Sequence, residues 1–412
     1  MDLQKKKGRT CVRPLFALLG LGVFSYFLYH SLAGGTLLAH SPYDSYSLMA
    51  ENWLAGHLDL PDGASRDWLE LAVYEGNYYI SFPPVPAVFQ LPWVLVCGGA
   101  AAVPSHLIQA LYGLLGLAGV YCLFARRRFA APDCLFWAVL SVAGSNLYWM
   151  TTDGGVWFQA QALCFALLVW GLYFAFGTGT GPHTLAAFLL ALAVGCRPFT
   201  ILYLAVYLGL LFFRQSRTGR KKLRMPGAGF WLPFAAAALV GAALAAFNWV
   251  RFGNIFEFGH NYLPEFAVET DGQFRLAYLV PNLLSLLRPV TLTAAGDLNF
   301  PRFNGFAFFL ANPIFLLWAV RMGQRIWRRS FSKWEGGMLA CFAVSVVLLC
   351  LHRTLGGWQF GARYLVDCIP WVLLSEVQLP AKARRHLSGG AWTLCAAAVL
   401  FNAYGAVYML TH

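Results

Sequence analysis

Long apolar runs recur along the whole chain and constrain its fold more than any other feature. Each of the clearest runs has about 20 residues, the length that crosses a bilayer as an α-helix. They are residues 14–34, 106–125, 156–176, 228–250 and 391–410. Because backbone polar groups in hydrocarbon must be hydrogen-bonded within their own segment, these runs are predicted to be helices. The alternation that marks membrane barrel strands is absent from the sequence.

Charged residues are scarce and gather between the apolar runs. Only 12% of the 412 residues are charged and 59% are hydrophobic, whereas soluble domains carry about 25% charged residues. The net charge of +12 comes from short basic clusters at residues 5–9, 126–128, 214–224, 321–333 and 382–385. Basic clusters beside apolar runs are typical of cytoplasmic loops. The charge therefore indicates membrane topology and argues against nucleic-acid binding.

If every basic cluster is cytoplasmic, an even number of crossings must separate any two clusters. This parity requires that residues 85–103 do not cross. Pro86 and Pro92 are expected to interrupt this stretch, which predicts an interfacial or re-entrant segment on the outer side. By the same argument, residues 184–213 are predicted to be two short helices that meet at Arg197 on the outer side. The result is an all-α polytopic protein with about eleven transmembrane helices, a cytoplasmic N-terminus and an outer C-terminus.

The first apolar run has two interpretations. A basic start, an apolar stretch and the sequence Ser31-Leu32-Ala33 resemble a secretory signal peptide. The stretch is longer than the apolar region of an ordinary signal peptide, which has about 7–15 residues. We therefore expect an uncleaved first helix.

Two long polar segments fall on the outer side in this topology. They are residues 35–105 and 251–304, and both are rich in Asp, Glu, Arg, Tyr and Trp. Within the first, residues 47–56 predict a short amphipathic helix along the membrane surface. No internal repeat or linker is visible, so residues 1–412 are expected to form a single membrane-embedded domain.

The two sides of the predicted membrane differ in their cations. All seven Lys fall on the cytoplasmic side, whereas the eight outer cations are all Arg. Arg forms bidentate hydrogen bonds with phosphate, which Lys cannot do. The bias therefore suits phosphate binding on the outer side, and ordinary compositional bias is the alternative.

Asp44 lies just beyond the first apolar run, at the predicted outer boundary of the bilayer. From this place a carboxylate can reach both a lipid headgroup and an aqueous acceptor. Partial burial would raise its pKa toward that of a useful general base. Because Asp is a favoured N-cap residue, capping of the short helix that follows is the competing interpretation.

After the Asp44 loop the chain has, in order, GHLDL (56–60), YYISFPPVPAVFQLP (78–92), CRP (196–198), NWVRFGNIFEFGHNY (248–262) and GGWQFGARYLVDCIP (356–370). The order of these motifs resembles the GT-C superfamily of membrane glycosyltransferases, which use polyprenyl-phosphate-linked sugars and include protein O-mannosyltransferases and lipid A aminoarabinose transferases. The resemblance covers residues 14–375. In one departure from the family pattern, Asp44 has no adjacent second acid, and Glu51 follows seven residues on. No cofactor is indicated, and this departure leaves a role for a divalent cation open.

The resemblance implies an inverting glycosyltransferase that moves a sugar from a polyprenyl-phosphate donor to a hydroxyl of a glycan, lipid or protein acceptor. The reaction would occur on the outer face of a bacterial cytoplasmic membrane, with Asp44 as the catalytic base. The donor phosphate would bind Arg363, Arg251 or Arg197. At Arg363 a helix start would add its dipole to the side-chain charge. For each Arg, snorkelling to the interface is the alternative.

Six further residues are candidates for substrate binding under the same resemblance. They are Asp153, Glu51, His260, Glu257, Tyr79 and Trp358. Simpler interpretations remain: N-terminal capping for Asp153, an ordinary surface position for His260, and interfacial anchoring for the aromatic residues. No cysteine or histidine spacing indicates a metal site.

Two other functions compete with glycosyl transfer. A transporter or flippase of a lipid-linked glycan would suit the broken segment 184–213, but mid-membrane charges are few and no repeat is apparent. A glycan polymerase or ligase would place its key charges in one late outer loop. The distinctive first outer loop favours the transferase.

Overall fold

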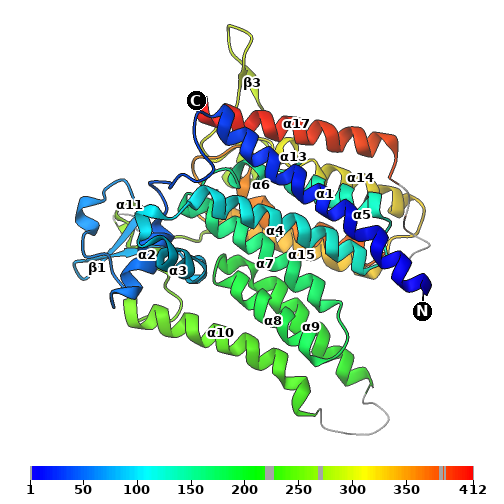
Figure 1. Ribbon diagram of the computed structural model, residues 1–412, viewed down its shortest axis with the longest axis horizontal. Helices are drawn as coiled ribbons and strands as arrows, with labels where there is room; N and C mark the ends of the chain where they lie inside the picture. The colour runs from blue at the N-terminus through cyan, green and yellow to red at the C-terminus, as the bar shows by residue number, and fades with distance from the viewer. Residues whose placement is uncertain (1, 219–226, 268–271, 380–383, 385–386, 412) are drawn as a thin grey trace. The chain divides into compact units, whose positions relative to one another are not determined.

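The computed structural model describes residues 2–218, 227–267, 272–379, 384 and 387–411. The described chain is mostly helical, with two short hairpins (Figure 1). It divides into two compact units. Unit 1 comprises residues 1–37, 107–153 and 273–412, and unit 2 comprises residues 38–106 and 154–272.

Unit 2 contains four long helices: α7 (Val156–Ala175), α8 (Thr180–Val194), α9 (Ile201–Thr218) and α10 (Ala228–Phe252). Helix α8 packs against α7, α9 and α10 (Figure 1). The predicted break at Arg197 is confirmed, because α8 ends at Val194 and a 3₁₀ turn, η3 (Pro198–Thr200), precedes α9. Pro198 has no backbone N–H to donate and cannot continue α8.

The remainder of unit 2 is built from short elements. They are α2 (Ser45–Leu54), η1 (Gly63–Ser65), β1 (Leu71–Tyr74), β2 (Asn77–Ile80), α3 (Val85–Cys97), η2 (Ala100–Ala102), η5 (His260–Tyr262) and α11 (Pro264–Ala267). Helix α2 matches the predicted helix to within two residues at each end. Helix α3 has 13 residues, too few to cross a bilayer, which supports the expectation that this segment does not cross. The expectation that Pro92 interrupts it is wrong, since Pro92 lies inside α3.

The β1–β2 hairpin was not expected from an all-α sequence. The strands pair antiparallel, with Leu71 opposite Ile80 and Tyr74 opposite Asn77. Its two-residue turn has positive φ at Glu75 (50°) and Gly76 (79°), as a type I′ hairpin turn requires. The aromatic and β-branched residues on either side of Glu75-Gly76 are the signal that could have predicted it.

Unit 1 holds the first and last helices of the chain and the elements between residues 273 and 377. Its elements are α1 (Asp2–Leu32), most of α4 (Ser105–Arg126), α5 (Ala131–Val142), α6 (Leu147–Met150), η6 (Leu276–Tyr278), α12 (Leu279–Ser285), β3 (Thr291–Leu292), β4 (Leu298–Asn299), α13 (Phe308–Ala311), α14 (Ile314–Trp327), α15 (Lys333–Leu351), η7 (Arg363–Cys368), α16 (Ile369–Val377) and α17 (Gly389–Thr411). Helix α17 packs on α5 and α6, and α16 packs on α14 and α15.

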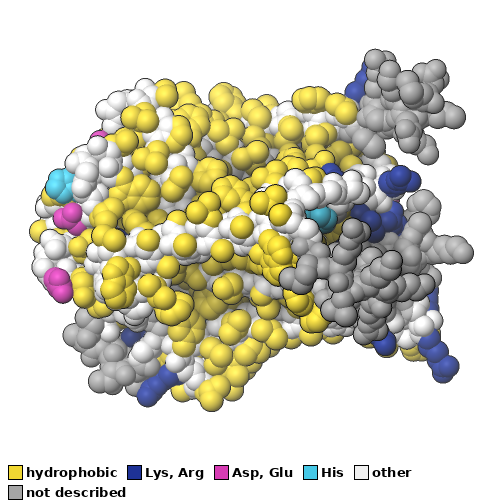
Figure 2. Space-filling model, turned by 90° about the horizontal axis from the view of Figure 1, so that it is seen from below, with side chains coloured by type: hydrophobic (Ala, Val, Ile, Leu, Met, Phe, Trp, Pro, Cys, Tyr) yellow, Lys and Arg dark blue, Asp and Glu magenta, His cyan; other side chains and the backbone are white. Residues whose placement is uncertain are grey.

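Six helices within the described residues are long and apolar enough to cross a membrane, judged by length and composition. They lie at Val12–Leu32, Ser105–Arg126, Val156–Ala175, Ala228–Phe252, Lys333–Leu351 and Gly389–Thr411. Five shorter apolar helices, one of which is α3, accompany them. The total of about eleven crossings stays a prediction. Figure 2 shows hydrophobic side chains covering much of the surface in view. The protein is therefore a multi-pass membrane protein.

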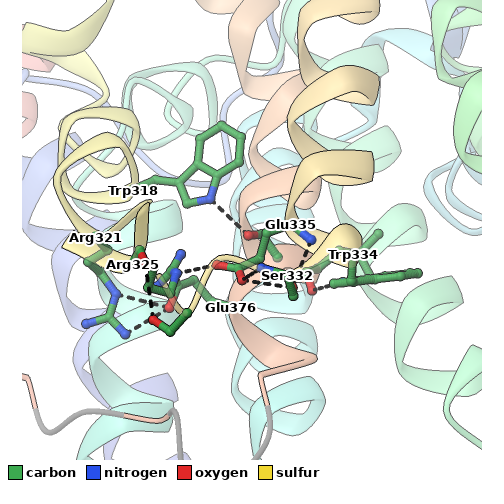
Figure 3. Close-up of polar contacts among 10 residues, drawn as sticks. Trp318, Arg321, Arg325, Ser332, Trp334, Glu335 and Glu376 are labelled. Carbon is green, nitrogen blue, oxygen red and sulfur yellow. Dashed lines mark hydrogen bonds and ion pairs between the residues drawn. The ribbon is translucent and has the colours of Figure 1, made fainter. Parts of the chain in front are cut away.

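A buried ionic network joins three helices of unit 1 (Figure 3). Arg321 on α14 donates from Nε (3.0 Å) and Nη2 (2.9 Å) to Oε2 of Glu376 on α16. Arg325 donates to Oε1 of Glu376 (2.9 Å) and also pairs with Glu335 on α15. Glu335 in turn completes a capping box with Ser332. Two Arg thus balance two acids, which are both almost fully buried.

Candidate functional site

Asp44 is the N-cap residue of α2 in unit 2, and its side chain is 1% exposed. Its Oδ1 accepts the backbone N–H of Ser47 (3.1 Å), and its Oδ2 accepts the Ser47 hydroxyl (2.6 Å). The capping interpretation is therefore confirmed. Capping fixes the direction of the carboxylate, so it does not exclude a chemical role for the same group.

Two buried glutamines continue the hydrogen-bond network of Asp44. Gln159 on α7 donates from Nε2 to Asp44 Oδ1 (2.7 Å) and to the carbonyl oxygen of Gly154 (2.7 Å). Its Oε1 accepts Nε2 of Gln90 on α3 (2.5 Å). Sequence reasoning missed both glutamines. Their signal was a polar amide inside an apolar run, because a buried amide needs hydrogen-bond partners there.

The environment of Asp44 favours its protonated form more than water does. Burial raises the pKa of Asp44, and the donors Ser47 and Gln159 and the positive charge of His40 oppose this effect only in part. A carboxylate offers about four acceptor sites. The described partners occupy two at Oδ1 and one at Oδ2. One site on Oδ2 is therefore left for a proton.

A compact hydrophobic cluster connects α2 with the hairpin and with α10. Tyr46 and Met49 of α2 belong to the same buried cluster as Ile80, and Trp53 and Phe247 pack against it. The rings of Trp53 and Phe247 are 5.4 Å apart at their centroids. This packing places the start of α2 and the last turns of α10 in one core.

Arg251 lies in the last turn of α10 and is 3% exposed. Its Nη1 donates to the Ile80 carbonyl (3.0 Å), and its guanidinium carbon lies 4.0 Å from the Phe247 ring centroid and 4.6 Å from that of Phe252. Among the described residues its Nε has no hydrogen-bond partner. A buried guanidinium with a free donor is suited to bind an anionic oxygen.

Tyr79 belongs to an aromatic group beside Arg251. Its ring packs edge-on against that of Phe252, with 5.2 Å between the ring centroids. The ring centroids of Phe252 and Tyr262 are 5.3 Å apart. Burial is the main cause that raises the pKa of the Tyr79 hydroxyl. The hydroxyl is therefore neutral at physiological pH and able to donate a hydrogen bond.

The other candidates in unit 2 have local structural partners. Glu257 is buried and accepts the Gly259 N–H at Oε1 (2.6 Å) and the Asn261 amide at Oε2, so it folds the loop after α10. Glu51 is exposed and accepts the Ala100 N–H (3.1 Å) at the start of η2. His260 begins η5 half-buried, and Arg197 is partly buried in the N-cap position of η3.

Three candidates lie in unit 1, at a distance in sequence from Asp44. Arg363 begins η7, as a helix start was expected there, although the helix is 3₁₀ and not α. Its Nε (3.1 Å) and Nη2 (2.6 Å) both donate to the Gly356 carbonyl. Gly356 has φ +107°, and an added Cβ would lie 2.8 Å from Arg363 Nε. Trp358 is 52% exposed, with the Arg302 guanidinium 4.3 Å from its ring centroid.

Asp153 follows α6 and is partly buried. The alternative interpretation, that Asp153 caps the next helix, is wrong, because the N-cap residue of α7 is Gly155. Within the ranges that the structure describes, no group of three or more His, Cys, Asp or Glu is placed to hold a metal ion.

Comparisons with known proteins agree with this architecture at the level of structure. No family model matches the sequence, and no curated protein matches it significantly. The fold is similar to ArnT from Cupriavidus metallidurans bound to undecaprenyl phosphate, with a TM-score of 0.50 and 13% identity over 92% of this chain and 61% of that one. It is also similar to the Archaeoglobus fulgidus oligosaccharyltransferase, with a TM-score of 0.51 and 15% identity over 97% and 56%.

A second structure of the archaeal enzyme, AglB in complex with an inhibitory peptide and a dolichol-phosphate, gives a TM-score of 0.50 and 13% identity over 96% and 55% of the two chains. The present chain thus spans 55–61% of the length of these three solved chains. Both enzymes are GT-C superfamily members. The resemblance seen in the sequence motifs is therefore confirmed as a GT-C-like fold.

Proposed function

We propose that the chain is an inverting glycosyltransferase that moves a sugar from a polyprenyl-phosphate donor to an acceptor hydroxyl on the outer face of the membrane. The observation that carries the proposal is the buried carboxylate of Asp44, which has a raised pKa and one acceptor site left on Oδ2. The fold supports it, because solved chains with this fold hold undecaprenyl phosphate or dolichol-phosphate.

In this mechanism Asp44 Oδ2 takes the proton of the acceptor hydroxyl while the hydroxyl oxygen attacks the anomeric carbon. The bond between that carbon and the phosphate oxygen breaks, and polyprenyl phosphate leaves with the bonding electrons. A single displacement inverts the anomeric centre. Orientation of the two reactants and stabilisation of the departing charge supply most of the acceleration.

Arg251 is the cation that we assign first to the departing phosphate. Its guanidinium lies over the ring of Phe247, which packs against the same hydrophobic cluster as Tyr46 of α2. Its Nε is buried with no hydrogen-bond partner among the described residues. Arg363 and Arg197 remain candidates for the same role. For Arg363, binding would compete with the Gly356 carbonyl, which already accepts two of its donors.

The remaining candidates would contact the sugar or the acceptor. Tyr79 and Trp358 offer rings for stacking, and Glu51, Asp153 and His260 offer polar groups. Glu257 would act indirectly, by shaping the 255–262 loop that it folds. The polar outer segments would face the acceptor, with the N-terminus cytoplasmic and the whole chain forming one domain in a bacterial cytoplasmic membrane.

The test is turnover in liposomes with a panel of polyprenyl-phosphate sugars and a cell-envelope extract as the source of acceptor. Release of polyprenyl phosphate is measured for the wild type, for Asp44→Asn, and for Asp62→Asn, which alters an exposed acid of the same outer segment. We expect Asp44→Asn to lose turnover about 10²–10⁴-fold and Asp62→Asn to retain it. Donor translocation without bond cleavage, unchanged in Asp44→Asn, would support the flippase instead.

A further inference from the structure

We propose that Gln159, held in place by Gln90, is the positioning residue that leaves Oδ2 of Asp44 as the atom that receives the proton. This inference rests on the proposed function for its role in turnover. The coupling between Gln159 and Asp44 can be measured without any substrate, so the two proposals can fail separately.

The orientation of the Gln159 amide is determined by its neighbours. Its nitrogen faces two acceptors, Asp44 Oδ1 and the Gly154 carbonyl, at 2.7 Å each. The opposite orientation would direct the amide oxygen at both acceptors and leave them without a donor. The Gln159 oxygen must therefore face α3, where it accepts from Gln90 Nε2 at 2.5 Å.

This arrangement makes the two oxygens of Asp44 unequal. Oδ1 receives two N–H donors, from the Ser47 backbone and from Gln159. Oδ2 receives the Ser47 hydroxyl and keeps one acceptor site. Donors on Oδ1 stabilise negative charge there and hold the carboxylate plane, so an incoming proton is directed to Oδ2.

The role of Gln90 is indirect. Both glutamines are 0% exposed, and burial of an amide is unfavourable unless hydrogen bonds compensate it. Gln90 Oε1 is buried with no hydrogen-bond partner in the described part of the chain. Packing alone would be better served by an apolar side chain at this position. The unpaired oxygen of Gln90 is consistent with a residue whose role is the hydrogen bond that its Nε2 donates to Gln159.

Two histidines lie near Asp44 and its partner Gln159. His40, in the loop before α2, is close enough that its positive charge lowers the pKa of Asp44. His106, at the start of α4, accepts the Gly154 N–H at Nδ1 (3.0 Å), next to the carbonyl that Gln159 uses. Both histidines are kept unchanged in every variant, so that their effect on stability cancels when two variants are compared at the same pH.

The experiment measures the melting temperature of purified protein from pH 3.5 to 8, with and without Asp44→Asn. A group with a raised folded pKa favours the folded state at low pH, and this contribution is lost as pH rises through the folded pKa. The wild type should therefore lose stability relative to Asp44→Asn as pH rises. The difference should become constant above the folded pKa of Asp44.

The comparison with and without Asp44→Asn is then repeated in a chain that carries Gln159→Met. This substitution removes the amide donor at nearly constant side-chain volume. Loss of a donor to the charged form raises the pKa of Asp44 in the folded protein further. The decline in stability relative to Asp44→Asn should therefore continue to higher pH. Gln161→Met is the matched control, because Gln161 is equally buried and lies two residues further along α7. Its profile should coincide with that of the wild type. Gln90→Met should shift the profile in the same direction by a smaller amount.

Coincident profiles for Gln159→Met and the wild type would overturn the inference, as would an equal shift in Gln161→Met. If Gln159→Met does not fold, Gln159→Glu serves as the second variant. Its carboxyl group beside Oδ1 should also extend the decline to higher pH, because two adjacent carboxylates cannot ionise independently.

Turnover gives the second readout, in the liposome assay. We expect Gln159→Met to lower kcat about 10- to 100-fold with little change in KM, and to move the acid limb of the profile to higher pH. Loss of turnover in Asp44→Asn with an unaffected Gln159→Met would overturn the positioning role alone. Full turnover in Asp44→Asn would overturn the proposed base, whatever the melting profiles show.

Discussion

Two buried acids in this protein have opposite surroundings. Asp44 in unit 2 and Glu376 in unit 1 are both 1% exposed. Glu376 is bound by two guanidinium groups, those of Arg321 and Arg325. Asp44 is bound by neutral donors, and no Lys or Arg pairs with it among the described residues.

The difference indicates which acid is suited to chemistry. The carboxylate of Glu376 is the shared partner of two guanidinium groups, so its removal would leave buried cations uncompensated. A carboxylate held by neutral donors can gain or lose a proton without that penalty. We infer that the ionic network joins α14, α15 and α16 structurally (Figure 3), whereas Asp44 is the acid able to exchange protons during a reaction.

The largest expected effect comes from breaking the ionic network. Glu376→Gln should lower the free energy of unfolding by about 3–5 kcal/mol, because two buried cations lose their shared partner. Thermal and denaturant unfolding in detergent would measure the loss. Glu265→Gln, at an exposed position of α11, should leave stability unchanged. A melting temperature for Glu376→Gln close to that of the wild type would contradict the contrast between the two acids.

The pH dependence of turnover should follow Asp44. Burial raises the pKa of Asp44, and in the proposed mechanism Asp44 must be deprotonated to act. Activity should therefore fall as pH falls, about tenfold per pH unit below the pKa of Asp44. The fall should begin above the ordinary Asp pKa of about 3.9. A rate–pH profile between pH 3.5 and 8 would measure it. An acid limb at or below the ordinary value would show that Asp44 is not the group that limits turnover.

Much of the helical layout could be predicted from sequence, since apolar length and charge position largely determine which segments are membrane helices. The break at Arg197 and the short α3 followed from parity between basic clusters and from proline chemistry. The β1–β2 hairpin and the interior place of Pro92 did not. Both depend on local packing, which overrides a pattern of apolar residues.

The candidate site was predicted in part. Asp44 was singled out by its place just beyond the first apolar run and by the resemblance, and Arg251 by the resemblance alone. Both are buried in unit 2. Gln90 and Gln159 could not be identified, because an isolated Gln in an apolar run gives no indication of which distant residue it contacts. Their contacts with each other and with Asp44 join α3, α7 and α2, and this proximity follows from tertiary structure alone.

The stability effects of replacing Asp44 should be smaller than those of replacing Glu376. Asp44→Asn should change the free energy of unfolding by less than about 1 kcal/mol at pH 7, because Asn also caps helices well. Asp44→Ala removes the cap and should cost about 0.5–2 kcal/mol. Unfolding of the two variants, measured beside turnover, separates the roles. A loss for Asp44→Asn as large as that for Glu376→Gln would show that charge at Asp44 is structural.

The smallest effect is expected where an acid is paired in water. Asp62 accepts Nε (2.9 Å) and Nη2 (2.6 Å) of Arg66 four residues on, and both side chains are partly exposed. Asp62→Ala should cost about 0–1 kcal/mol, less at high salt. The Arg66 guanidinium lowers the pKa of Asp62, so this contribution is present above the ordinary Asp pKa and is lost as pH falls through the lowered value. Melting temperatures at two salt concentrations would measure this contribution. A loss of stability near that of Glu376→Gln would mean that burial does not determine how much an ion pair contributes to stability.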